Sequence, residues 1–327
     1  MGRSHRAPGR RERRRIRTDL ERSSAGGGHC RARAASSAPW LVAALLVAAG
    51  CGDEDSPGAT PTGAVTVTGT SQGGSGGTGS TGGGTTGQGG GGGAGTDYFG
   101  TLPAGAALPD DDTCTSLVRR SDWEPRRDNE VANHTTPTAD ELAFYATGSW
   151  SGQDPEADTT IRSRVTGDFV GTTDEIIQWG ACKWGIDEDV IRAMAVKESG
   201  WHQDGRGDWT TDQQYCPPGT WEGDGCYQSY GMLQVKWRYS QETWPMSRDD
   251  TAFSLDYVYA SMRSCLEGYI AWFDAAETAG YPDYAPGDLW GCVGRHYSGS
   301  WYDQGAIDYI AAVEEILADR PWEQSDF

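Results

Sequence analysis

Apolar side chains recur at helical spacing in the C-terminal half of the chain. After Thr172 or Thr173, either of which can cap a helix, the run EIIQWGACKW offers large apolar residues to bury. A second run, EDVIRAMAVKES, follows Asp187 and stops at Gly200. The pattern predicts two consecutive helices separated by a short turn.

Two further helices are predicted nearer the C-terminus. One begins at Ser254 or Asp256 and closes at Gly280 and Pro282. Its apolar positions recur three and four residues apart, at Val258, Met262, Cys265, Leu266, Tyr269 and Phe273. The last covers 306–320 and buries Ile307, Ile310, Ala311, Val313 and Leu317. The best strand candidate is short, YGMLQVKW at 230–237. We therefore expect a mainly α fold, a single helical domain over residues 171–327.

The residues before this domain carry weaker signals. Residues 113–170 are polar and poorly periodic, which indicates an ordered but mostly irregular lead-in packed on the domain. Residues 51–112 are dominated by Gly, Ser and Thr. A segment of that composition buries too little apolar surface to offset the entropy of ordering, so we expect a disordered tether.

Residues 1–50 have the composition of a secretory signal. They hold 11 Arg and 3 acidic residues, followed by ten apolar residues, WLVAALLVAA. Ten is short of the roughly 20 residues that span a bilayer. The sequence VAAGC resembles a bacterial lipobox, which implies a lipid anchor on Cys51. The alternative is a plain signal peptide with Cys51 incidental. Gly52, rather than an acid, favours the outer membrane as the site of this cell-envelope lipoprotein.

Charge and cysteine content exclude two classes of function, nucleic-acid binding and zinc binding. Beyond residue 50 the chain has 16 basic and 44 acidic residues, the wrong sign for a nucleic-acid partner. An even number of cysteines in an exported domain predicts up to three disulfides, whereas a zinc site would need a CxxC or CxxH pair that the chain lacks. The candidates are Cys114, Cys182, Cys216, Cys226, Cys265 and Cys292. Cys216 and Cys226 flank a turn-rich segment, so a local bridge pinning that loop is the first expectation; the other pairings stay open.

One carboxylate interrupts the apolar face of the second helix. Ile191, Met194, Ala195 and Glu198 share one face by their spacing. An apolar wall and the negative end of a helix dipole both disfavour an ionised carboxylate, and a carboxylic acid that keeps its proton can donate it to a leaving group. The alternatives are a buried glutamate paired with Lys or Arg, or an exposed helix end.

Three short motifs, in order, resemble the lysozyme-like superfamily of lytic transglycosylases and goose-type lysozymes. Its members typically show a helix ending in Glu-Ser, then Gly-Leu-Met-Gln-Ile, then Ala-Tyr-Asn with a nearby Gly. Glu198-Ser199 matches the first motif and 231–235, GMLQV, the second. The third is matched in Tyr297 and Gly299 alone. The resemblance covers about residues 171–318.

The resemblance implies a substrate and a set of roles. The family cleaves the β-1,4 bond between N-acetylmuramic acid and N-acetylglucosamine in peptidoglycan, and Glu198 would protonate the glycosidic oxygen. Gln234 and Tyr297 would line the sugar cleft, Met232 would form part of its wall, and Ser199 would orient the acid or touch substrate. No cofactor and no metal are implied. The expected partners are peptidoglycan glycan strands and, through Cys51, a membrane.

Departures from the family pattern keep alternatives open. Ser298 replaces the usual Asn, and an insert separates the first two motifs. The insert's tryptophans could stack on sugars or simply pack, and its acids could supply a second carboxylate: Trp201, Trp209, Trp221, Asp204, Asp208, Glu222 and Asp224. We favour a single-acid lytic mechanism that yields a 1,6-anhydro sugar over hydrolysis. The rivals are an inactive glycan-binding or structural lipoprotein and a hydrolase of another amino-sugar polymer.

Overall fold

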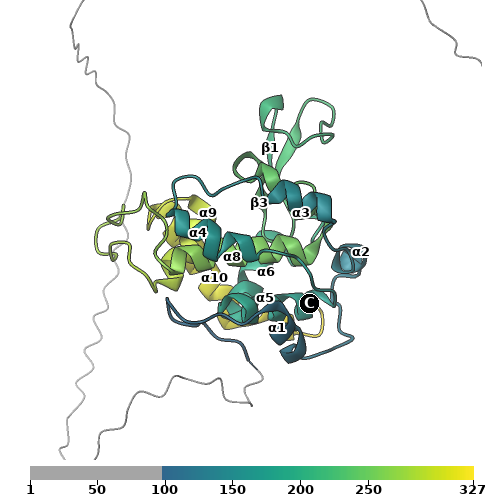
Figure 1. The fold of residues 1–327 in the computed structure, drawn as a ribbon, viewed down its shortest axis with the longest axis horizontal. Coiled ribbons are helices and arrows are strands. Elements are labelled where there is room, and N and C mark those ends of the chain that lie inside the picture. Colours follow the sequence, from purple (N-terminus) through teal and green to yellow (C-terminus); the bar gives the residue numbers. More distant parts are fainter. Residues whose placement is uncertain (1–97) are drawn as a thin grey trace, which may run out of the picture. The chain divides into compact units, whose positions relative to one another are not determined.

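The computed structural model describes residues 98–327, and this part of the chain is mainly helical (Figure 1). The helices are α1 Asp111–Leu117, α2 Glu130–Asn133, α3 Ala139–Tyr145, α4 Pro155–Thr160, α5 Thr173–Trp184, α6 Glu188–Ser199, α7 Met246–Asp249, α8 Thr251–Leu266, α9 Leu289–Ser298 and α10 Gln304–Asp319. The strands are β1 Arg206–Thr210, β2 Cys226–Tyr230 and β3 Val235–Lys236. The predicted mainly α class is confirmed.

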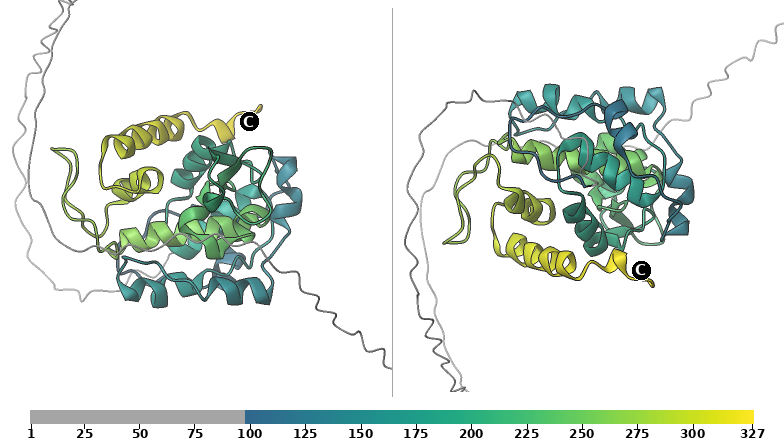
Figure 2. Two further views of the ribbon diagram at one scale, coloured as in Figure 1. Left: turned by 90° about the horizontal axis from the view of Figure 1, so that it is seen from above. Right: turned by 90° about the horizontal axis from the view of Figure 1, so that it is seen from below.

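Helices α5, α6 and α8 form the centre of the core. The long α8 is buried on nearly every side, and the hydroxyl of Tyr259 donates to the carbonyl of Ile177 on α5 at 2.8 Å. Gly180 of α5 lets the two helices approach, because a Cβ at that position would collide with the Tyr259 ring. Helix α10 packs against both α6 and α9, and Figure 2 shows α9 and α10 running side by side.

The two best-marked helices begin and end where their local chemistry predicts. Thr172 and Glu175 form a reciprocal capping box at the start of α5. The side chain of Asp187 accepts from two backbone N–H groups of α6, and Gly200 ends that helix in the left-handed conformation with φ 63°. The polar end of α6, which carries Glu198, is therefore fixed by its own sequence.

The third predicted helix is wrong at both ends. α8 begins four to six residues earlier than expected, with Asp250 as its N-cap, and it ends at Leu266. Gly268 adopts φ 91°, its N–H bonds to Cys265, and the N–H of Tyr269 bonds back to Ser264. This Schellman arrangement terminates the helix, so Tyr269 and Phe273 lie in a loop. The last helix matches its prediction closely, except that Ala311 is exposed.

The predicted strand over 230–237 is also wrong. β2 ends at Tyr230, residues 231–234 turn, and only Val235 and Lys236 form β3. Gly231, at φ 83°, permits the turn because a Cβ there would collide with the carbonyl of Ser247. The three strands make an antiparallel sheet in the order β1-β2-β3, and the β1–β2 hairpin projects from the helical body (Figure 1).

Three disulfides join the six candidate cysteines, as predicted. Cys216–Cys226 is the expected local bridge, and it pins the loop at the end of the β1–β2 hairpin. The two pairings that the sequence left open are Cys114–Cys182, which ties α1 to α5, and Cys265–Cys292, which ties α8 to α9.

The segments before α5 are more regular than predicted. The lead-in contains α2–α4 and most of α1 rather than being mostly irregular. The expected tether extended to residue 112, but its last part packs on the domain, where Leu102 N–H bonds to the carbonyl of Gly185 and Arg263 donates to the carbonyls of Leu102 and Pro103. The apolar Phe99 and Leu108 also pack against the core, which the Gly-rich composition upstream obscured.

Several sequence predictions fall on residues outside the described part. The signal peptide at 1–50, the lipidation site Cys51 and the tether up to residue 97 belong to this group. Among residues 98–327, every helix is too short or too polar to cross a bilayer.

Asp250, the N-cap of α8, gives the fold a testable pH dependence. Its Oδ1 accepts from Phe253 N–H at 2.8 Å, while its buried Oδ2 has no hydrogen-bond partner among the described residues. Burial, supported by the negative charge of Asp256, raises the pKa of Asp250 from 3.8 to about 8. The folded state therefore holds a proton that the unfolded state releases, so stability falls as pH rises between these two values.

Asp250→Asn keeps the capping oxygen and removes the titration. We expect thermal unfolding of this variant to change less between pH 5 and pH 9 than that of the wild type. Asp303→Asn, at the N-cap of α10, is the matched control and should keep the wild-type pH dependence. Equal pH dependence in Asp250→Asn and the wild type would show that Asp250 is not protonated in the folded protein.

Candidate functional site

Glu198 lies in the last turn of α6 and is partly screened from solvent, with 13% of its side chain exposed. The predicted stripe is confirmed, because Ile191, Met194 and Ala195 on the same face are fully buried. Oε1 of Glu198 lies 3.7 Å from Nε2 of His296 on α9. The carboxylate therefore has a histidine, and neither Lys nor Arg, within ion-pair distance in the described structure.

Two aromatic groups complete the surroundings of the carboxylate. The hydroxyl of Tyr309 on α10 is buried without a hydrogen-bond partner of normal geometry among the described residues. Burial, helped by the negative charge of Glu198, raises the pKa of Tyr309 far above its usual value, so this hydroxyl keeps its proton. Burial lowers the pKa of His296 below its ordinary value, with Arg295 adding to the shift and Glu198 opposing it. Near neutral pH, the imidazole beside Glu198 is uncharged.

Ser199 connects the end of α6 to the turn that follows β2. Its hydroxyl donates to the carbonyl of Met232 at 2.9 Å. The Met232 side chain is fully buried and is not among the residues that line the cleft described below. The apolar residues of GMLQV are all buried, and Ser199 links that turn to the helix that carries the carboxylate.

Gln234 ends the same turn in a conformation that few non-glycine residues adopt. Its φ is 51°, and its amide Nε2 donates to the carbonyl of Gly231 at 2.8 Å. Gly205, just before β1, and Gly207, within β1, leave room for the amide, because a Cβ at either position would press on it. A left-handed glutamine costs of order 1 kcal/mol and is typical of positions that serve a site.

Gln234, His296 and Tyr297 lie together on one cleft of about 660 Å³. The cleft is lined by Ser149, Trp150, Ser151, Gln153, Gln234, Val235, Lys236, Tyr239, Ser240, Tyr257, Val258, Ser261, Met262, Trp272, Arg295, His296, Tyr297, Ser298, Gly299 and Ser300. Glu198 is not itself among the lining residues; it contacts the cleft through His296. Ser298 lines the cleft and exchanges hydrogen bonds with the backbone of Ser300.

Exposed aromatic rings border this cleft. Tyr239 is 71% exposed, Tyr297 63% and Trp272 49%. Tyr297 stacks on Tyr309 with ring centroids 5.0 Å apart and an interplanar angle of 7°. Large rings beside serine hydroxyls, amides and a histidine form a surface that offers both stacking and hydrogen bonds, as a carbohydrate ligand requires.

The insert between the first two motifs contributes no tryptophan to the cleft lining. Trp201 is fully buried, with Trp322 stacked on it and Phe327 packed edge-on, so it serves packing. Trp209 and Trp221 are exposed on the hairpin but do not line the cleft. The insert's candidate second carboxylates, 204, 208, 222 and 224, do not line it either.

Sequence reasoning missed His296, Tyr309 and Arg295. His296 and Arg295 precede Tyr297 directly, so the third motif contained the signal. Tyr309 occupies a buried position on α10 and carries no motif of its own.

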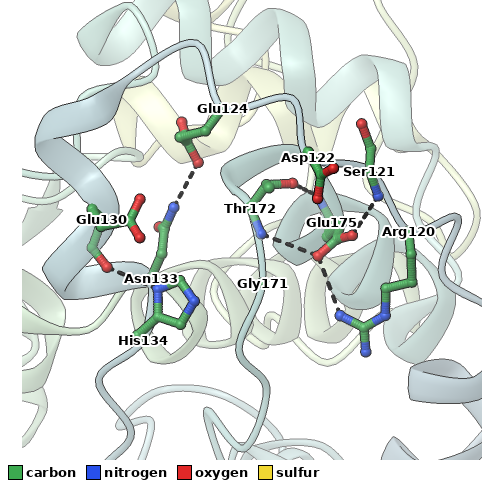
Figure 3. A pocket seen from close by; sticks show the side chains of 10 residues that line it. All are labelled: Arg120, Ser121, Asp122, Glu124, Glu130, Asn133, His134, Gly171, Thr172 and Glu175. Atoms are coloured by element: carbon green, nitrogen blue, oxygen red, sulfur yellow. Dashed lines mark hydrogen bonds and ion pairs between the residues drawn. The ribbon is translucent and has the colours of Figure 1, made fainter.

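A second hollow, of about 520 Å³, lies at the N-terminal end of α5 (Figure 3). Two of its four acids, Glu124 and Glu175, are engaged within the protein. Glu175 accepts from Ser121 N–H, Thr172 N–H and Arg120, and Glu124 accepts from Asn133. The hydrogen bonds around this hollow therefore connect the lead-in to α5. Over residues 98–327, no group of three or more His, Cys, Asp or Glu is placed to hold a metal ion.

No protein-family model matches the chain, and neither a curated protein nor a solved structure matches it significantly.

Proposed function

We propose that the protein cleaves the β-1,4 bond between N-acetylmuramic acid and N-acetylglucosamine in peptidoglycan, with Glu198 as general acid. The observation that carries the proposal is the position of Glu198. A largely screened carboxylate ends a buried helix, faces a neutral histidine, and adjoins an aromatic and hydroxyl-rich cleft. The matching motif residues Ser199, Gln234 and Tyr297 gather around the same helix end and cleft, which supports the resemblance noted in the sequence.

The chemistry needs one proton transfer in each direction. Glu198 donates its proton to the glycosidic oxygen as that bond breaks. The muramic 6-hydroxyl then closes on C1, and the carboxylate accepts the proton of that hydroxyl, which leaves a 1,6-anhydro sugar. The hydroxyl of Ser199 holds the turn that presents Gln234, whose amide and the Tyr297 ring would position the sugars beside the acid.

The acids of the insert favour a single-acid mechanism over one with a nucleophilic carboxylate. Asp208 is engaged by Lys236 at 2.9 Å and by the Ser229 hydroxyl, and Glu222 pairs with Arg206. A nucleophile or base for hydrolysis has to face the reacting carbon, whereas Asp208 and Glu222 are directed at the cationic side chains of Lys236 and Arg206.

One observation favours a second candidate, a glycan-binding protein without catalysis. Glu198 touches the cleft only through its contact with His296 and is not among the lining residues. In this alternative, the aromatic cleft holds a glycan strand and Glu198 serves only to place His296.

Incubation of the purified protein with purified peptidoglycan and, separately, with chitin separates the candidates. We expect soluble fragments from peptidoglycan and none from chitin. Binding to peptidoglycan without release of fragments would favour the binding protein, and release from chitin alone would identify a hydrolase of a different amino-sugar polymer.

A further inference from the structure

An arginine without an acidic partner faces the cleft. Arg295 lies in the last turn of α9 and lines the hollow that also contains His296 and Tyr297. Its hydrogen bonds within residues 98–327 run from Nη1 to the hydroxyl of Ser261, at 3.1 Å, and to the carbonyl of Ser261, at 3.4 Å. The guanidinium also lies 6.0 Å from the centre of the Trp272 ring. Most of its five N–H donors are therefore left for another partner.

Arg295 is partly buried, and its lack of an acidic partner contrasts with the buried arginines of the described residues. Arg162, Arg192 and Arg263 each form an ion pair with a carboxylate. No carboxylate in the described structure lies within ion-pair distance of Arg295. Burial lowers the pKa of Arg295, and no acid appears among the groups that oppose the shift.

The cleft lining as a whole also lacks acidic side chains. Beyond residue 50 the chain has 44 acidic residues, yet none of the lining residues is Asp or Glu. The lining includes Arg295, Lys236 and His296, and Lys236 is paired with Asp208. The cleft of this acidic protein therefore has no negative side chain in its lining. Within residues 98–327, the Arg295 guanidinium is its one positive charge without an acidic partner.

We propose that Arg295 makes the cleft a binding site for the carboxylate of a glycan ligand. A planar guanidinium matches a carboxylate bidentately, and such charge-assisted bonds are shorter and about twice as strong as neutral ones. The guanidinium is partly withdrawn from water and still faces the cleft, so a ligand carboxylate could reach the N–H donors that the protein leaves unpaired. The inference rests on the proposed function only in taking a glycan to be the ligand of the cleft.

Peptidoglycan offers this carboxylate from two sources. The lactyl group of N-acetylmuramic acid carries a free carboxylate where the stem peptide has been removed, and the stem peptide carries carboxylates where it is present. If the lactyl group is recognised, an amidase that cleaves the bond between lactyl group and peptide must supply the substrate.

Binding calorimetry on Glu198→Gln protein tests the inference without turnover. The ligands are an alternating tetrasaccharide with free lactyl carboxylates, its methyl ester, the same glycan with stem peptides attached, and neutral tetra-N-acetylchitotetraose. We expect a carboxylate ligand to bind about 10- to 100-fold more tightly than the ester, which corresponds to the usual strength of a hydrogen bond to a charged group. The peptide-bearing glycan shows which source supplies the carboxylate.

Variants test whether the preference for the carboxylate ligand over its ester depends on Arg295. Adding Arg295→Gln should reduce the ratio of acid to ester affinity to about one and leave binding of the neutral oligomer unchanged. Arg127→Gln, an exposed arginine of the lead-in, removes the same charge and should preserve the ratio. Equal binding of acid and ester by unaltered Arg295 protein would overturn the inference, even if the Arg295 variant failed to fold. So would a carboxylate preference that survives in folded Arg295→Gln, or a cleft that binds none of these glycans. A carboxylate preference together with no cleavage by the wild type would instead contradict the proposed function alone.

Discussion

Glu198→Gln should lower peptidoglycan turnover by about two to four orders of magnitude, the usual contribution of a general acid. The amide keeps the size of the side chain but cannot donate the proton that the leaving oxygen requires. Folding should survive, because the carboxylate has no Lys or Arg within ion-pair distance among the described residues, and the imidazole of His296 beside it is uncharged near pH 7. Turnover per folded molecule and thermal unfolding are to be measured together.

Glu315→Gln provides the matched control for this experiment. Glu315 is exposed on α10 and away from the cleft lining, so both turnover and stability should stay at wild-type levels. If Glu198 is a structural residue instead, Glu198→Gln will unfold at lower temperature while each folded molecule turns over at the normal rate. That pattern would refute the mechanism.

Lys183→Met should cause the largest loss of stability, about 3–5 kcal/mol, because it leaves a buried carboxylate without its cation. Lys183 and Asp256 are both fully buried and lie 2.9 Å apart, and Asp111 contacts the same ammonium at 3.0 Å. Asp256 also accepts from the indole of Trp184 and from the backbone N–H groups of Thr166 and Gly167. The pair thus joins α5 and α8 to the lead-in.

Chemical denaturation measures this effect. Lys197→Met removes an exposed lysine from α6 and should change the free energy of unfolding by no more than about 0.5 kcal/mol. Combining Lys183→Met with Asp256→Asn should cost less than the sum of the two single changes, because the carboxylate that then lacks its cation is Asp111, which is partly exposed to water. Similar losses for Lys183→Met and Lys197→Met would show that the buried pair does not stabilise the fold.

The sequence predicted the parts of this fold that depend on local chemistry. Thr172 and Asp187 cap their helices with side-chain oxygens, and Gly200 ends α6 in a conformation that glycine adopts without strain. These signals lie within a few residues of the effect, and they fixed the position of Glu198 on a buried helix face. The local bridge Cys216–Cys226 was predictable for the same reason.

The parts of the fold and the site that were not predicted depend on contacts between residues far apart in the chain. The sequence does not show that α9 brings His296 to Glu198, or that α10 adds Tyr309. The end of α8 was mispredicted because apolar residues continue at helical spacing past Gly268, where they pack as a loop. The full burial of Met232 was not predictable, because a short apolar motif does not reveal which of its side chains face the core.

Mass analysis of the fragments that the wild-type protein releases from purified peptidoglycan tests the central claim most directly. A single-acid lytic enzyme leaves N-acetylmuramic residues with a 1,6-anhydro end, lighter by one water than the ends left by hydrolysis. We expect soluble fragments with anhydro ends from the wild type and almost none from Glu198→Gln. Fragments with hydrolysed ends would contradict the single-acid route, and the absence of fragments from folded, glycan-binding protein would contradict the enzyme itself.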